Sequence, residues 1–147
     1  MAAQNSLNAP LPLSVANGGT GNTTGTTSVP WTTVTPEMTG ITLAKSNGYI
    51  IAPNAFETLL NMPAAPAIGD TFYIQGYSNT AFTISPTIFQ TIFFSDGTSG
   101  TSGQMLTPNS SYPYAALTLV CVDSPAVNPQ RFVAFSTNGA TFQWVGP

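Results

Sequence analysis

The chain has 147 residues, enough for one domain with a buried core and an additional arm. Only 5% of its residues are Asp, Glu, Lys or Arg, against roughly a quarter in ordinary soluble domains, so a lone subunit lacks the usual electrostatic protection against self-association and we expect an assembly. Lys45 and Arg131 are the only cationic residues and the net charge is -3, which argues against a nucleic acid or an anionic membrane as partner.

Residues 1–38 differ from the rest because prolines and glycines are spread among Thr, Ser and Asn. Prolines block helices and central strands and glycines permit tight turns, so the pattern predicts an extended N-terminal arm, with a disordered leader as the alternative. Apolar side chains recur in this segment, and a simple linker has no use for them. We therefore expect the arm to make assembly contacts through Leu11, Leu13, Val15 and Trp31.

From residue 39 onward the pattern is typical of β-structure. The apolar residues 41–44 and 49–51 flank Asn47-Gly48, and this dipeptide is the strongest short signal for a hairpin turn. Residues 56–60 fit either a strand or a helical turn, because their apolar spacing satisfies both periods.

Further strands are predicted over residues 71–75 and 82–85, where apolar and polar residues alternate. Residues 88–94 are strongly apolar and end at a turn pair, and residues 117–122 form a nearly continuous apolar strand, as expected in the middle of a sandwich. Cys121 is expected to act as a small buried hydrophobe. Residues 98–103 have the composition of a loop after the turn pair Asp96-Gly97.

The last two predicted strands, residues 131–135 and 141–145, flank a second hairpin signal at Asn138-Gly139. In all, about seven or eight short strands are separated by regular turn signals. The sequence thus predicts an all-β fold: an antiparallel β-sandwich or barrel-like domain over residues 39–147, preceded by the extended arm over residues 1–38. We expect no further domain after Val145.

The residues that usually carry chemistry are scarce. The chain has no histidine, and its one cysteine can form neither an internal disulfide nor a Cys-rich zinc site. A pair of carboxylates could still serve a glycan-degrading enzyme, but Asp70 and Asp96 stand beside glycines in turn positions. We expect a non-enzymatic protein with no catalytic, cofactor-binding or metal-binding residues. No secretory signal or membrane-spanning stretch is expected either.

Exposed aromatic side chains could instead form a platform for a neutral glycan, because binding to such a ligand requires no charge. The alternative is that most of them belong to the core or to a subunit interface. The candidates are Trp31, Tyr73, Tyr77, Tyr112, Tyr114 and Trp144.

Two stretches resemble known phage sequences. Residues 10–21, PLPLSVANGGTG, resemble the PLPVANGGTG-type motif of phage and prophage tail-fibre-like proteins. Residues 46–76, from SNGYI to GDTFYIQG, resemble a recurring phage structural module, which residues 117–122 and the closing Phe-Gln-Trp strand also fit. The chain departs from this module at two places. Residues 61–63 are Asn-Met-Pro where Leu-Pro is usual, and the Gly-Gly-Trp that often follows Gly76 is missing. The resemblance implies a virion accessory protein of a tailed bacteriophage, commonly oligomeric, and implies no catalytic residue.

The resulting hypothesis is a capsid decoration or cement protein, made in the bacterial cytoplasm and located on the particle surface. Its β-domain would sit on the shell while its arm braces neighbouring subunits. The expected partners are further copies of the chain, as a homotrimer by resemblance, and the major capsid protein or tail proteins, with a host-surface glycan as a further candidate. The alternatives are a short tail fibre or receptor-binding component, which the N-terminal motif favours, and a carbohydrate-binding module. The single β-domain without shaft repeats favours decoration.

Overall fold

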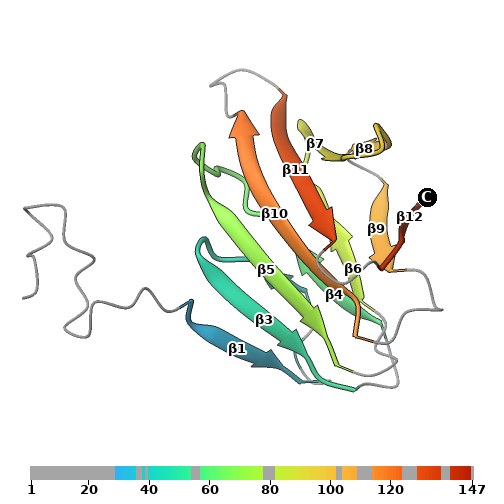
Figure 1. Cartoon of the computed structure of the whole chain (residues 1–147). Coiled ribbons are helices and arrows are strands. Elements are labelled where there is room, and N and C mark those ends of the chain that lie inside the picture. Colours follow the sequence, from blue (N-terminus) through green and yellow to red (C-terminus); the bar gives the residue numbers. More distant parts are fainter. Residues whose placement is uncertain are drawn as a thin grey trace, which may run out of the picture.

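The computed structural model shows an all-β domain (Figure 1), as the sequence predicts. The described residues are 29–35, 38, 40–53, 57–77, 82–101, 104–108, 114–123, 129–136 and 140–146. They form twelve strands, and no helix occurs among them. Leu11, Leu13 and Val15 lie outside the described residues.

The strands form two sheets. In spatial order, the seven-stranded sheet consists of β1 (Trp31–Val34), β3 (Asn47–Ile51), β5 (Thr71–Gly76), β10 (Ala116–Asp123), β11 (Gln130–Ser136), β7 (Gln90–Phe94) and β8 (Ser99–Thr101). The five-stranded sheet consists of β12 (Phe142–Val145), β9 (Met105–Pro108), β6 (Phe82–Ser85), β4 (Thr58–Asn61) and β2 (Ile41–Thr42). β1 comes from the end of the predicted arm, so this part of residues 1–38 belongs to the sheet.

One hydrophobic core joins the inner faces of the two sheets, as in a β-sandwich. The seven-stranded sheet contributes Phe72 and Leu119, and the five-stranded sheet contributes Leu60 and Ile84, all fully buried. The alternation predicted for residues 71–75 is therefore confirmed. In β6 the apolar Phe82 and Ile84 belong to the core, but Thr83 between them is buried as well. Cys121 is also fully buried, and this burial raises the pKa of its thiol.

The sheets are mixed, which corrects the prediction of an antiparallel sandwich. From β1 to β6 the chain alternates between the sheets, so β1, β3 and β5 are parallel neighbours in one sheet. β2, β4 and β6 are parallel neighbours in the other. A strand that returns to its sheet after crossing to the opposite sheet runs in its original direction, which produces parallel pairs.

Most strands of the seven-stranded sheet point the same way (Figure 1). The pairs β1–β3, β3–β5 and β7–β11 are parallel, and β5 and β11 are both antiparallel to β10 between them. β1, β3, β5, β7 and β11 therefore begin at one end of the sandwich, which we call the entry end, and finish at the opposite exit end. Because β1 begins at Trp31, the N-terminal segment joins the domain at the entry end.

Neither Asn-Gly pair forms the predicted hairpin. Residues 41–42 and 47–51 lie in different sheets, and Asn47-Gly48 starts β3 instead of forming a turn. The turn lies one residue earlier, where Ser46 has a positive φ of 58°. The second pair, Asn138-Gly139, lies outside the described residues, but the flanking strands β11 and β12 also belong to different sheets.

Two short segments were difficult to assign from composition. Residues 58–61 form strand β4, so the helical alternative is wrong. Residues 99–101, predicted as loop, form β8, which pairs with β7. Gly100 of β8 lies directly against the indole of Trp144, since an added Cβ would be 2.2 Å from that ring. Short strands such as β8 explain why the structure has twelve strands and not the predicted seven or eight.

The contact between Trp144 and Gly100 predicts an effect on stability. Gly100→Ala must displace the indole, and overpacking of this kind costs about 1–3 kcal/mol. Gly146→Ala is a matched control, because a Cβ there would meet nothing within 4 Å. Urea denaturation of both variants measures the difference, and equal midpoints would show that the contact is unimportant.

Candidate assembly surface

Trp31 is the one predicted arm contact that the structure describes. It is the first residue of β1, and its side chain is 51% exposed. Its indole lies flat over Gly48 of β3, where a Cβ would come within 2.4 Å of the ring. Its ring centroid is 6.5 Å from that of Tyr73 on β5. Gly48 is therefore a site of close approach between a side chain and a backbone.

Residues paired with Trp31 and Gly48 on the neighbouring strands form one row across the outer face of the seven-stranded sheet. Trp31 is paired with Gly48, Gly48 with Tyr73, Tyr73 with Thr118 and Thr118 with Phe135. Side chains paired in this way project from the same face of a sheet. Because the alternate residues face the core, this aromatic row faces outward.

The next row on the same face is also uncharged. Thr71, Val120, Val133 and Phe93 are paired in succession, and all four are half-buried. The outer face becomes charged only at Arg131, whose Nη1 lies 3.8 Å from Asp123 Oδ2. Both side chains of this pair are about half exposed, a geometry that contributes little to stability.

Large apolar side chains are also exposed at the entry end. Ile68 precedes β5, Ile88 and Phe89 precede β7, and Val122 lies at a bulge near the end of β10. Ile68, Ile88 and Phe89 are 69%, 68% and 59% exposed. We call these four residues the entry-end apolar set. Together with the start of β1, they place exposed apolar groups at the end where the N-terminal segment joins.

Phe89 has an unusual backbone conformation. Its φ is 70°, a left-handed value that is uncommon for residues other than glycine and asparagine. Such a conformation costs of order 1–3 kcal/mol and persists only where surrounding contacts enforce it. One such contact is the hydrogen bond from Gln130 N to Phe89 O, 2.7 Å long.

A pair of glutamines holds the entry-end loops. Gln90 is buried, and its Nε2 donates to Pro63 O (2.6 Å) and to Gln130 Oε1 (2.8 Å). Its Oε1 accepts from Thr87 N (2.8 Å), while Gln130 Nε2 donates to Ala64 O (3.2 Å). These bonds tie the β4–β5 and β6–β7 loops to the starts of β7 and β11. The exposed residues on these loops are therefore presented on a fixed framework.

Sequence reasoning missed this framework. In the sequence, residues 88–94 form one strongly apolar run that ends at a turn pair. The strand begins at Gln90 instead, and the polar Gln90 is buried while its two apolar predecessors are exposed. Pro86, two residues before Ile88, is a signal that could have indicated a loop there.

The aromatic residues proposed as a glycan platform do not form one group. Trp144 packs half-buried over Gly100, whereas Tyr73 lies beside Trp31 on the outer face. Tyr77 and Tyr114 form an edge-to-face pair at 5.9 Å near the exit end of β5. Tyr112 lies outside the described residues.

Two of the acidic residues, Asp70 and Asp96, have local roles. Asp70 Oδ2 accepts from Ala67 N (2.8 Å), and Asp96 Oδ1 accepts from Thr98 N (2.8 Å), which confirms both as turn residues. Within the described ranges, no three His, Cys, Asp or Glu side chains are grouped as a metal site would require. The same part of the chain has no helix with the length and hydrophobicity that a membrane crossing requires.

Comparison with known proteins finds neither a family model nor a curated protein that matches the chain.

The glutamine framework predicts a large effect of one polar substitution. Gln90→Ala leaves the Thr87 amide and the Pro63 carbonyl without their buried partner, which should lower the free energy of unfolding by about 1–3 kcal/mol. Gln143→Ala, at an exposed position of β12, should change it little. Equal effects of the two substitutions in urea denaturation would contradict the structural role of Gln90.

Proposed function

We propose that this protein is a non-enzymatic structural protein of a tailed-bacteriophage particle, most specifically a capsid decoration or cement protein. The β-domain would sit on the shell, and the N-terminal segment would brace neighbouring subunits. The proposed assembly is a homotrimer on the major capsid protein, a state that light scattering on the isolated protein would test. The phage setting rests on the resemblance of residues 10–21 and 46–76.

The observation that best supports an assembly role is the arrangement of the entry end. The N-terminal segment joins the domain there, and Ile68, Ile88 and Phe89 are exposed on loops that the glutamine pair holds. Large exposed apolar groups are typical of protein interaction sites. The low charge of the chain points in the same direction, because few charges oppose its close approach to another neutral surface.

A short tail fibre or receptor-binding component is the second candidate. The observation that favours it is the PLPLSVANGGTG segment, which resembles a motif of tail-fibre-like proteins. In that case the same entry end would attach to the tail instead of the shell. Copy number in purified particles distinguishes the two candidates, since hundreds of copies indicate shell decoration and at most a few dozen indicate the tail. Absence of the protein from particles would contradict both.

The arm hypothesis predicts that removal of residues 1–28 separates folding from assembly. The deletion spares Pro30, whose carbonyl accepts from Gly48 N (2.9 Å), and leaves β1 complete. We expect a folded β-domain with an unchanged cooperative thermal transition but little incorporation into particles, measured by quantitative mass spectrometry. Normal incorporation of the truncated protein would show that the arm is dispensable.

The entry-end hypothesis predicts a specific effect of Phe89→Asn. Asparagine tolerates a positive φ, so the variant should fold at least as stably while losing the exposed ring. Tyr114→Asn is a matched control, since Tyr114 is also exposed with a positive φ (66°) but lies near the exit end. We expect reduced incorporation into particles for Phe89→Asn only. Equal incorporation of both variants would exclude Phe89 from the docking surface.

A further inference from the structure

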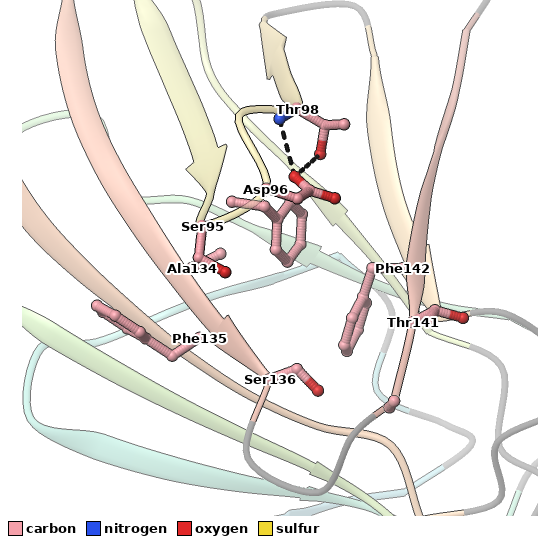
Figure 2. Close-up of a pocket in the computed structure, with 10 residues that line it drawn as sticks. Ser95, Asp96, Thr98, Ala134, Phe135, Ser136, Thr141 and Phe142 are labelled. Atoms are coloured by element: carbon pink, nitrogen blue, oxygen red, sulfur yellow. Dashed lines mark hydrogen bonds between the residues drawn. The ribbon is translucent and has the colours of Figure 1, made fainter.

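A pocket of about 270 Å³ opens at the exit end of the sandwich. It lies between the ends of β7 and β11 and the start of β12 (Figure 2). Phe142 projects into it from β12, and Phe94 lines it from β7. Ala134 and Ala140 are buried and small, which leaves the space between the strands open.

The aromatic wall of this pocket is fixed by packing. The rings of Phe94 and Phe142 stack with centroids 5.9 Å apart and an angle of 22° between their planes. The ring of Phe142 also packs against that of Phe82 in the core, with 6.4 Å between the ring centroids. The ring of Phe94 packs against that of Trp144, with a centroid distance of 6.2 Å. Because both rings are held from behind, a flat apolar surface is present before any ligand arrives. By contrast, Phe135 points away on the other side of β11 (Figure 2).

A single carboxylate stands at the rim in a fixed orientation. Asp96 Oδ1 accepts hydrogen bonds from Thr98 Oγ1 (2.7 Å) and Thr98 N (2.8 Å), and these two bonds lower the pKa of the carboxyl group. The group is therefore an ionised acceptor at neutral pH. Both bonds from Thr98 go to Oδ1 (Figure 2), and we take Oδ2 as the oxygen that would accept from a ligand.

The remaining lining determines the charge of the ligand. Ser95 and Ser136 add hydroxyl groups at the rim, whereas the Thr141 hydroxyl points away from the pocket (Figure 2), and none of the described lining residues is Lys or Arg. An anion would meet the Asp96 charge without a compensating cation. A calcium ion prefers six to eight oxygen ligands, and one carboxylate is too few. A neutral molecule with hydroxyl donors on its edge and a flat C–H face matches both parts of the lining.

We infer that this pocket binds one neutral pyranose ring of a glycan. The apolar face of the sugar would pack on Phe142, one sugar hydroxyl would donate to Asp96 Oδ2, and Ser136 would form a hydrogen bond with a second hydroxyl. The volume suits a single sugar ring, being just below the lower end of typical ligand pockets, about 300 Å³. This site is independent of whether the protein is attached to a shell or to a tail.

Titration of the ¹⁵N-labelled full chain by NMR tests the inference, with D-glucose, D-galactose, D-mannose and N-acetyl-D-glucosamine as probes. We expect at least one sugar to bind with a dissociation constant of about millimolar and to shift the amide signals of Ser136, Ala140 and Thr141. D-Galacturonate should bind about tenfold more weakly than D-galactose, because its carboxylate is repelled by Asp96.

Matched variants assign the binding to the pocket. Asp96→Asn keeps an oxygen for Thr98 but removes the charge, so affinity should fall about tenfold. Phe142→Leu keeps the apolar volume but removes the flat ring and should also weaken binding. Asp70→Asn, which changes a turn carboxylate at the entry end, should leave affinity unchanged. No binding of any probe, unchanged affinity in Asp96→Asn, or shifts centred on Trp31 or Tyr77 instead would each overturn the inference.

Discussion

The packing of Trp144 over Gly100 joins the two sheets at one edge, where β12 and β8 are the outermost strands. Only a residue without a side chain permits this approach, so the two positions depend on each other. The same contact sets the geometry of the exit end, because β8 follows the turn that carries Asp96 and Trp144 stands two residues after Phe142. The position of the pocket thus depends on how this edge is closed.

Neutral hydrogen bonds take the place that ion pairs have in more charged proteins. Gln90 is buried with both ends of its amide bonded, and Ala44 N donates to the Tyr49 hydroxyl at 2.7 Å. Such bonds fix the loops without adding surface charge. Their contribution also does not change with pH, since amides do not titrate in the normal range. The loops that contain Ala44, Pro63 and Thr87 are therefore held without added surface charge, which favours association with other neutral surfaces.

Local alternation made the all-β class and the buried faces of β5 and β6 predictable, because residues such as Phe72 and Ile84 report directly on burial. The topology was not predictable in the same way. Gly48 and Gly100 are signals for turns or loops in the sequence, but both serve as contact points for tryptophans that lie distant along the chain. The burial of Gln90 could not be predicted from the sequence either, because it depends on hydrogen-bond partners in the β4–β5 loop and on β11. Only the assembled fold places these groups together.

The direction of the strands relates the two proposed surfaces to each other. Gln90 is paired with Gln130 and Phe94 with Ala134, so β7 and β11 run side by side from the entry end to the pocket. The apolar residues Ile88 and Phe89 precede the first of these pairs, and Asp96 follows the last. A subunit attached through its entry end would therefore hold the pocket at its far end, facing away from the attachment surface. Attachment and ligand binding would then not compete for the same residues. A particle carrying many copies would present many sugar sites at once, and multivalent binding would compensate for the weak affinity of each site.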